Sequence, residues 1–187
     1  MMHAAMQLPF FTIGHSNRSL AAFVELLREA EVKRLVDVRK IPMSRANPQF
    51  NMNALSATLT EMQISYEHIA ALGGLRRGAK AFPATTNGLW TNASFHNYAD
   101  YALTAQFQEG FQHLLKGGHK QRSAIMCAEA VWWRCHRRII ADYLLARGET
   151  VFHITGANRI EPARMTPGAM VEPDGTVTYP ALRRDEI

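Results

Sequence analysis

The chain has 187 residues, of which 47% are hydrophobic and 20% charged, and its formal net charge is +5. The length is typical of about one domain, and the composition excludes a largely disordered protein. The positive charge favours anionic partners such as phosphates, nucleotides or nucleic acid, without selecting among them.

The sequence also bears on where the protein acts. No run of residues approaches the roughly 20 apolar positions that a membrane-spanning helix needs. The N-terminal stretch MMHAAMQLPFFTIGH lacks the basic and apolar regions of a signal peptide. Two cysteines are too few for the disulfide framework of a secreted protein. We therefore expect a cytoplasmic protein without a membrane partner; the sequence indicates no oligomeric state.

The first half of the chain is predicted to alternate strands with helices. The apolar run FFTIGH predicts a buried strand over 10–15. Ser19 is a typical N-cap, and the apolar residues after it repeat at helical spacing. VKRLVDVRK, residues 32–40, predicts a second strand, and the prolines of IPMSRANPQFN predict a loop after it. A helix over 54–62 and a strand near 64–68 complete this half.

The second half begins with a glycine-rich, basic stretch. Residues 72–91, which contain LGGLRRGAK, predict an exposed loop. Helical spacing follows over 98–115, then a strand in SAIMCAE, a helix over 132–147 and a strand in TVFHITG. In the tail, the Pro-Asp-Gly of MVEPDGTVTY separates two alternating runs and predicts a β-hairpin.

This alternation indicates the α/β class, with a mostly parallel β-sheet flanked by helices. Because no linker or internal repeat interrupts the pattern, we expect one domain over 1–187. Its core should span about 10–156, and the tail over 157–187 should carry the hairpin. In sheets of this kind, ligands bind at the carboxyl ends of the strands.

Polar side chains follow three of the predicted strands at the point where each strand ends. His15 ends the first, Asp37 and Arg39 end the second, and Cys127 and Glu129 end a later one. We expect these residues to share one crevice at one edge of the sheet. The alternative is that each is structural, with His15 in a turn and Asp37 and Arg39 in an ordinary ion pair.

His136 lies in the densest group of reactive residues, CAEAVWWRCHRR. At 100° per residue, the predicted helix places it among Trp132 and Tyr143 on the buried face. It should therefore point toward the sheet and hydrogen-bond Glu129 or Asp37, since an unpartnered buried polar group is costly. The alternative is a core histidine whose hydrogen bonds are satisfied.

Arg134, Arg137 and Arg138 lie in the first turns of the same predicted helix, where cations oppose the helix dipole. Glu129, Asp37 or a bound phosphate-like anion would compensate for them, and helix N-termini already attract anions. Arg134 and Arg138 should project away from His136, so Arg137 is the one expected to serve the site. Otherwise all three lie on a solvated face.

The two cysteines invite comparison with known sites. Cysteine-dependent phosphatases use the motif C-x5-R, whereas here six residues without a glycine separate Cys127 from Arg134. Cys127 is thus a catalytic candidate whose alternative role is that of a small buried hydrophobic residue. Cys127, Cys135 and His136 do not match a zinc-binding spacing. We expect neither a metal nor another cofactor.

Four ordered motifs, taken together, resemble one family. They are TIGHSNRS, DVRKIPMSR with the later PQF, the LGG loop, and MCAE followed by CHRRIIADYL. Over about residues 11–154 the chain resembles the family catalogued as domain of unknown function 488. The resemblance implies a shared site without naming a reaction, and it implies that the motif residues are His15, Asp37, Arg39, Ser44, Arg45, Cys127, Glu129, Cys135, His136 and Arg137.

The first functional hypothesis is a crevice that binds a small phosphate-bearing or nucleotide-like ligand and catalyses hydrolysis or group transfer. Guanidinium groups suit phosphate, and a carboxylate with a histidine suits acid–base catalysis. The catalytic candidates are His136, Glu129, Asp37 and Cys127, and the ligand-binding candidates are His15, Arg39, Ser44, Arg45 and Arg137.

The second hypothesis is a nucleic-acid-binding module. The basic loop LRRGAK and the aromatic residues Trp90, Phe95 and Trp132 would supply charge and stacking. The arginines are spread along the chain, however, and no known recognition pattern is present. The third hypothesis is a protein-interaction domain whose polar clusters are structural ion pairs.

Overall fold

The computed structural model describes residues 7–78 and 81–181, and parts of the predicted N-terminus, basic loop and tail lie outside these ranges. Its centre is a six-stranded sheet with the order β3-β2-β4-β1-β5-β6. The first five strands in this order are parallel, and β6 pairs antiparallel with β5. The strands are β1 (Phe10–Gly14), β2 (Arg34–Asp37), β3 (Ser65–His68), β4 (Ser123–Cys127), β5 (Val151–Gly156) and β6 (Arg159–Pro162).

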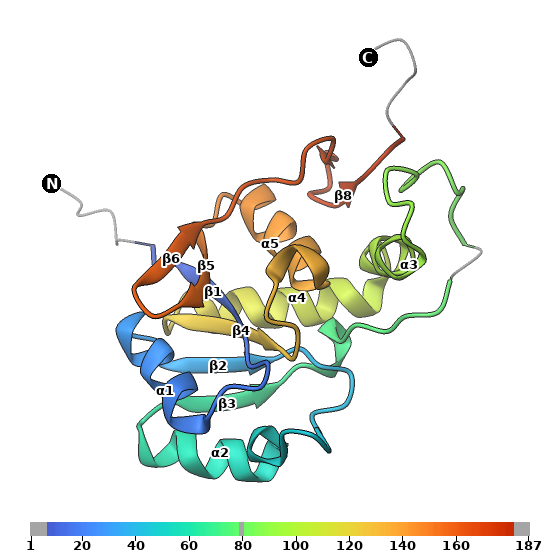
Figure 1. The fold of residues 1–187 in the computed structure, drawn as a ribbon. Coiled ribbons are helices and arrows are strands. Elements are labelled where there is room, and N and C mark those ends of the chain that lie inside the picture. The colour runs from blue at the N-terminus through green and yellow to red at the C-terminus, as the bar shows by residue number, and fades with distance from the viewer. Residues whose placement is uncertain (1–6, 79–80, 182–187) are drawn as a thin grey trace, which may run out of the picture.

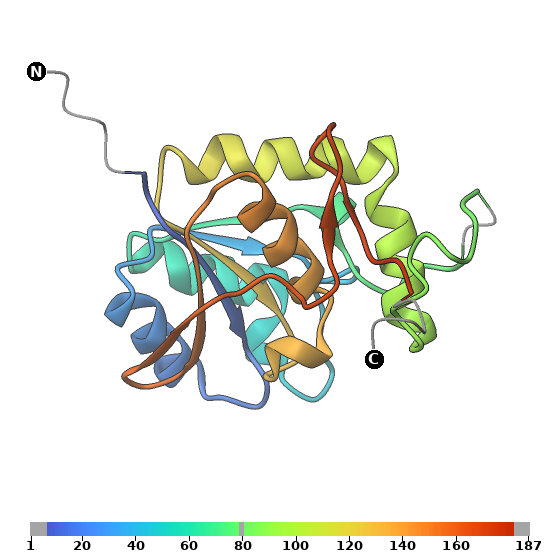
Figure 2. The same cartoon turned by 90° about the horizontal axis from the view of Figure 1, so that it is seen from above.

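Helices cover both faces of this sheet (Figures 1 and 2). One face carries α1 (Leu20–Glu29) and α2 (Met52–Glu61), and the other carries α3, α4 and α5. The predicted α/β class and mostly parallel sheet are therefore confirmed. The bounds of the remaining helices are α3 (Ala93–Ala102), α4 (Ala105–Gly118), α5 (Arg137–Ala146) and the 3-10 turns η1 (Pro48–Phe50), η2 (Ala70–Leu72) and η3 (Trp132–Arg134).

The two faces have separate cores because successive strand residues point to opposite sides. In β1, Phe10 joins the core under α3, α4 and α5, and Phe11 joins the core over α1 and α2. Leu35 and Val36 of β2 divide in the same way. The short apolar runs of the sequence are thus strands that are buried on both faces, as expected for a parallel sheet.

The helix predicted over 98–115 is two helices. α3 starts earlier, at Ala93, and ends at Ala102, and α4 begins after Thr104. The Thr104 hydroxyl accepts a hydrogen bond from the backbone N–H of Phe107, so it caps a new helix and interrupts the first. Ser19 caps α1 as predicted, because its hydroxyl accepts from the backbone N–H of Ala22.

The helix predicted over 132–147 is wrong in its first part. Residues Trp132–Arg134 form a 3-10 turn, and Cys135 is extended, with φ −123° and ψ 147°. α5 begins only at Arg137, with His136 as its N-cap residue. The helical projection from Trp132 therefore does not describe where the side chains of residues 132–136 point.

The remaining segments agree with the predictions in part. Apart from residues 79 and 80, the stretch 73–91 forms turns without helix or strand, as predicted. Leu72 belongs to η2, however, and Gly73, Gly74 and Asn87 are buried, so the predicted loop is exposed only in part. The predicted tail hairpin is confirmed by β7 (Met170–Val171) and β8 (Val177–Thr178), and its turn contains Gly175 at φ +80°. β6 was missed, because an exposed edge strand that ends in proline lacks the apolar alternation of a buried one. None of the described helices has the length and apolar character to cross a membrane.

Candidate functional site

The predicted polar residues meet at one edge of the sheet. The register places Gly14 beside Cys127 and Asp37 beside Met126 on the neighbouring strands β1, β4 and β2. The carboxyl ends of these three strands therefore coincide. This confirms the expectation that His15, Asp37, Cys127 and Glu129 lie at the same edge.

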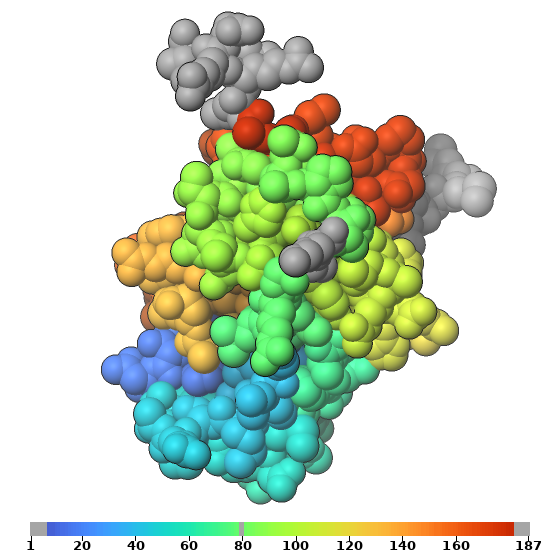
Figure 3. Space-filling view, turned by 90° about the vertical axis from the view of Figure 1, so that its right-hand side faces the viewer, coloured from blue at the N-terminus to red at the C-terminus, as the bar shows by residue number. Residues whose placement is uncertain are grey.

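A cavity of about 510 Å3 opens at this edge. The segments around it come from different parts of the chain: the loops after β1 and β2, the glycine-rich stretch, α3, and the segment from the end of β4 to the start of α5. Figure 3 shows the face on which the last four of these segments meet. The lining residues are His15, Arg39, Lys40, Ile41, Met43, Ser44, Gly74, Leu75, Ser94, Phe95, Tyr98, Cys127, Ala128, Glu129, Arg134, Cys135 and His136.

One side of the cavity is built on the buried ion pair of Asp37 and Arg39, and we call His15, Asp37, Arg39 and Tyr66 the arginine wall. Nη2 of Arg39 lies 2.6 Å from Oδ2 of Asp37, and Nε and the backbone N–H of Arg39 also donate to this carboxylate. The Tyr66 hydroxyl donates to the same Oδ2 at 2.7 Å. Asp37 is fully buried and does not line the cavity, so its role is to position Arg39 rather than to act on a ligand.

His15 completes the arginine wall in its neutral form. Its Nδ1 lies 2.8 Å from the carbonyl oxygen of Ser16, which can only accept, so Nδ1 carries the proton. Nε2 is then the acceptor that faces Nη1 of Arg39 at 3.3 Å. The ring stacks on Phe50 with centroids 4.3 Å apart. Burial, together with the charge of Arg39, lowers the pKa of His15 below its usual value.

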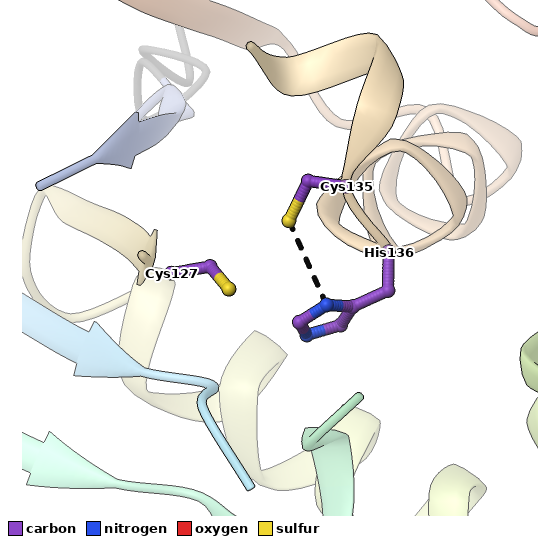
Figure 4. Close-up of side chains that lie close together, drawn as sticks. All are labelled: Cys127, Cys135 and His136. Carbon is purple, nitrogen blue, oxygen red and sulfur yellow. Dashed lines mark hydrogen bonds between the residues drawn. The ribbon is translucent and has the colours of Figure 1, made fainter. Parts of the chain in front are cut away.

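The opposite side, which we call the cysteine wall, consists of Cys127, Cys135, His136 and Arg137. The side chains of the first three converge, as Figure 4 shows. Nε2 of His136 lies 3.0 Å from the carbonyl oxygen of Val38, and Nδ1 lies 3.6 Å from Sγ of Cys135. The predicted hydrogen bond from His136 to Glu129 or Asp37 is therefore wrong. Because a carbonyl only accepts, Nε2 carries the proton and Nδ1 presents its lone pair to the sulfur.

Arg137 supports the cysteine wall from behind. Its side chain is 1% exposed, its Nε donates to Sγ of Cys135 at 3.3 Å, and its Nη2 donates to the carbonyl of Glu129. No carboxylate contacts this guanidinium within the ranges that the structure describes. A buried cation without a negative partner is unfavourable, so Arg137 favours a negatively charged sulfur at Cys135.

The two thiols differ in acidity for the same reason. Burial alone would raise the pKa of Cys135, but the neighbouring Cys127 thiol and the charge of Arg137 outweigh it and hold the pKa well below its usual value. The pKa of Cys127 is raised, first by its hydrogen bond to Cys135 and then by burial. Cys135 is thus the more acidic thiol of the pair, and Cys127 the less acidic one.

Two glycines make room for these walls. A Cβ on Gly14 would lie 2.0 Å from the carbonyl oxygen of Glu129, so β1 can approach the 129–130 backbone only as glycine. A Cβ on Gly74 would lie 2.8 Å from Nδ1 of His136. The LGG motif therefore contributes to the site by leaving room for the ring of His136, and it supplies no functional group of its own.

Six of the nine predicted site residues line the cavity: His15, Arg39, Ser44, Cys127, Glu129 and His136. Asp37 and Arg137 are buried behind them, and Arg45 is exposed away from the lining. Arg134 lines the cavity instead of Arg137, contrary to the prediction, because α5 begins later than expected. Sequence reasoning also missed Lys40 and the contribution of Cys135, although Cys135 lies within the CHRR motif.

The match to a known family is extensive. Residues 19–144 match a family model described as Domain of unknown function DUF488. This range includes every residue that lines the cavity except His15. No curated protein and no solved structure shows a significant match to the chain.

Proposed function

This chain belongs to the DUF488 family, and we propose that it binds in its cavity a small ligand that joins an anionic group to an apolar body, as a nucleotide does. The observation that supports the proposal most strongly is the composition of the cavity. Cationic side chains and exposed apolar side chains line the same space, and each set suits one part of such a ligand.

The cationic part consists of Arg39, Lys40 and Arg134, which face a single lining carboxylate, that of Glu129. Arg39 is held rigidly by Asp37, which contacts its Nε and Nη2 and leaves Nη1 toward His15. Lys40 and Arg134 are exposed, so they can adjust to a ligand. Guanidinium groups form paired hydrogen bonds with phosphate and carboxylate, which favours an anionic ligand group.

The apolar part lies at the cavity rim. Ile41, Met43 and Leu75 are 65%, 62% and 78% exposed, although each is a large hydrophobic residue. All three line the cavity together with Phe95 and Tyr98. Large exposed apolar groups that cluster around a cavity are typical of a ligand-binding surface. A flat apolar moiety such as a nucleobase would cover them.

The reaction class that we propose is hydrolysis or group transfer at the anionic group. Glu129 carries the carboxylate that is exposed in the cavity, and its Oε1 is oriented by the backbone N–H of Val131 at 3.0 Å. It is therefore the candidate general acid or base. Asp37, the other carboxylate candidate, is fully occupied by Arg39 and Tyr66.

The aromatic residues do not favour the alternative of a nucleic-acid-binding module. Trp90 stacks on Phe95 with centroids 4.7 Å apart, and Trp132 stacks on His153 at 4.1 Å. Their rings are engaged within the protein and offer less surface to successive bases. Binding to nucleic acid is therefore kept as an outcome of the following experiment.

The test is calorimetric titration of the full chain with inorganic phosphate, pyrophosphate and adenosine mono- and triphosphate. We expect one of these probes to bind at one site and Arg134→Ala to weaken it about tenfold, the effect of losing one charge-assisted hydrogen bond. Arg28→Ala removes an exposed arginine of α1 and should leave the affinity unchanged.

Two results would contradict the proposal. The first is that none of the four probes binds, and the second is that Arg134→Ala and Arg28→Ala bind equally well. If only long single strands bind, with an affinity that falls steeply with salt, the nucleic-acid alternative replaces it.

A further inference from the structure

The ligand atoms of Cys127, Cys135 and His136 all lie within 4.8 Å of one another, and their side chains point into one space (Figure 4). Zn–S bonds of about 2.3 Å and Zn–N bonds of about 2.0 Å in a tetrahedral site place sulfur and nitrogen about 3.6 Å apart. Sγ of Cys135 and Nδ1 of His136 are 3.6 Å apart. A modest movement of Cys127 would complete the triangle of ligands.

The tautomer of His136 is the one that a metal ligand needs. Its Nε2–H donates to the backbone carbonyl of Val38, which leaves the lone pair of Nδ1 directed toward the sulfur of Cys135. Histidines that bind metals almost always donate their other ring N–H to a carbonyl or carboxylate, because this fixes the ring and its tautomer. Tyr98 packs against the same ring, with centroids 4.9 Å apart.

The surroundings of the sulfurs also suit thiolate ligands. Arg137 donates from Nε to Sγ of Cys135, the kind of outer hydrogen bond that stabilises a metal-bound thiolate. Gly74 leaves open the space next to Nδ1 of His136, where any side chain would begin to fill it. Residues 127–136 thus bring together in space a set of donors that is not recognisable from their spacing in sequence.

We propose that Cys127, Cys135 and His136 bind one divalent metal ion of the zinc class. Two thiolates and one imidazole form the donor set that borderline-soft ions such as Zn2+ and Co2+ prefer, and Mg2+ and Ca2+ avoid. This site goes beyond the proposed anion-binding function and does not depend on it. The expectation of a chain without a metal, which rested on sequence spacing, is thereby replaced.

The fourth coordination position would open toward the cavity, because all three ligands line it. Structural zinc sites are closed by four protein ligands, whereas catalytic sites use three and keep one position for water or substrate. The site therefore has the form of a catalytic one. Only this part of the inference rests on the proposed function: water bound at that position would lie where the anionic group is expected.

The experiment uses the full chain, reduced and freed of metal with a chelator, and titrated with Co2+. We expect thiolate-to-cobalt charge-transfer absorption and the intense visible bands of tetrahedral Co2+, saturating at one ion per chain and disappearing when Zn2+ is added. The chain contains two cysteines, so any sulfur-to-cobalt signal comes from this site. A thiol assay on the same sample should count both as free.

Three variants separate the ligands from their surroundings. Cys127→Ser and His136→Gln should each lose the one-to-one complex. Gly74→Ala keeps all three ligands but places a Cβ against Nδ1 of His136, so it should weaken Co2+ binding at least about tenfold. His119→Gln is the matched control, since His119 is exposed and bonded to Glu149 outside the cavity. Circular dichroism of each metal-free variant establishes that it has folded.

The proposal is overturned if reduced protein with two free thiols gives no sulfur-to-cobalt band, or if the band is unchanged in folded His136→Gln. The phosphate titrations are repeated on metal-free protein, and the cobalt titrations are done without phosphate. Loss of anion binding with an intact cobalt complex contradicts the proposed function alone. Anion binding without a cobalt complex contradicts the metal site alone.

Discussion

The two walls of the cavity use the same kinds of residue in opposite ways. In the arginine wall, every polar side chain is bonded to another: Asp37 to Arg39 and Tyr66, and His15 to Arg39 and the backbone. In the cysteine wall, Nδ1 of His136 and the sulfur of Cys127 still have the capacity to bind something else.

This difference shows that residue type alone does not define a functional group. Asp37 is an ionisable carboxylate at a strand end, but its neighbours occupy it fully, and it serves the fold. The Nε2–H of His136 donates to a backbone carbonyl, and this bond leaves the lone pair of Nδ1 directed at the sulfur of Cys135, where a metal could use it. We therefore expect substitutions in the arginine wall to affect mainly stability, and those of Cys127 and His136 in the cysteine wall to affect mainly metal binding.

The largest expected effect is that of Arg39→Ala. It leaves Asp37 charged, buried and without its cation, which should lower the free energy of unfolding by about 3 to 5 kcal/mol. Urea denaturation followed by circular dichroism measures this change. Arg45→Ala, an exposed arginine on the next loop, should change stability by less than about 0.5 kcal/mol. If both substitutions lowered the free energy of unfolding equally, the structural role assigned to the arginine wall would be wrong.

The next effect concerns pH and His153, which lies behind the cysteine wall against Trp132. Burial, and then the charge of Arg137, lowers the pKa of His153 from 6.5 to about 4. The unfolded chain therefore takes up this proton at higher pH than the folded chain does. The resulting stability is complete above about pH 6.5 and is lost as the pH falls toward 4, by up to about 3 kcal/mol.

Urea unfolding of the wild type and His153→Gln at several pH values between 4 and 7 measures this contribution. The variant should lose less stability on acidification, although it is less stable at neutral pH. Arg28→Ala, which removes an exposed arginine of α1, should keep the wild-type slope. If the stability of His153→Gln fell with decreasing pH as steeply as that of the wild type, His153 would not be the titrating group.

A smaller effect is expected for Tyr66→Phe in the arginine wall. It removes the hydroxyl that donates to Oδ2 of Asp37, a hydrogen bond to a charged group, and should cost about 1.5 to 2 kcal/mol. Tyr101→Phe removes a comparable bond to the neutral carbonyl of Ala71 and should cost about 1 kcal/mol or less. Denaturant midpoints compare the two. A smaller loss for Tyr66→Phe would argue against a charged Asp37.

The smallest effect on stability is expected for Cys127→Ser. The side chain is half-buried at the cavity, and serine is close to cysteine in size, so the free energy of unfolding should change by less than about 1 kcal/mol. The same variant should lose the cobalt complex. Destabilisation as large as that of Arg39→Ala would mean that Cys127 belongs to the structural core.

The sequence by itself determined the class of the fold and the edge of the sheet that carries the site. Short apolar runs alternating with helical spacing indicate a parallel sheet, and polar residues at the ends of parallel strands lie at the same edge of it, because such strands run in one direction. That the three strands are neighbours follows from the strand order of the structure. His15, Cys127 and Glu129 were found in this way. The family resemblance placed Cys135 among the motif residues without giving its partners.

Only the tertiary structure decided which of these residues can act. The late start of α5 moves Arg134 into the cavity and Arg137 behind Cys135, and a helical projection cannot predict a break that depends on contacts with the sheet. The free lone pair of His136 depends on the carbonyl of Val38, 98 residues earlier in the chain. Side-chain chemistry is local in sequence, but the hydrogen-bond partners that occupy it or leave it available come from distant segments, and only folding brings them together.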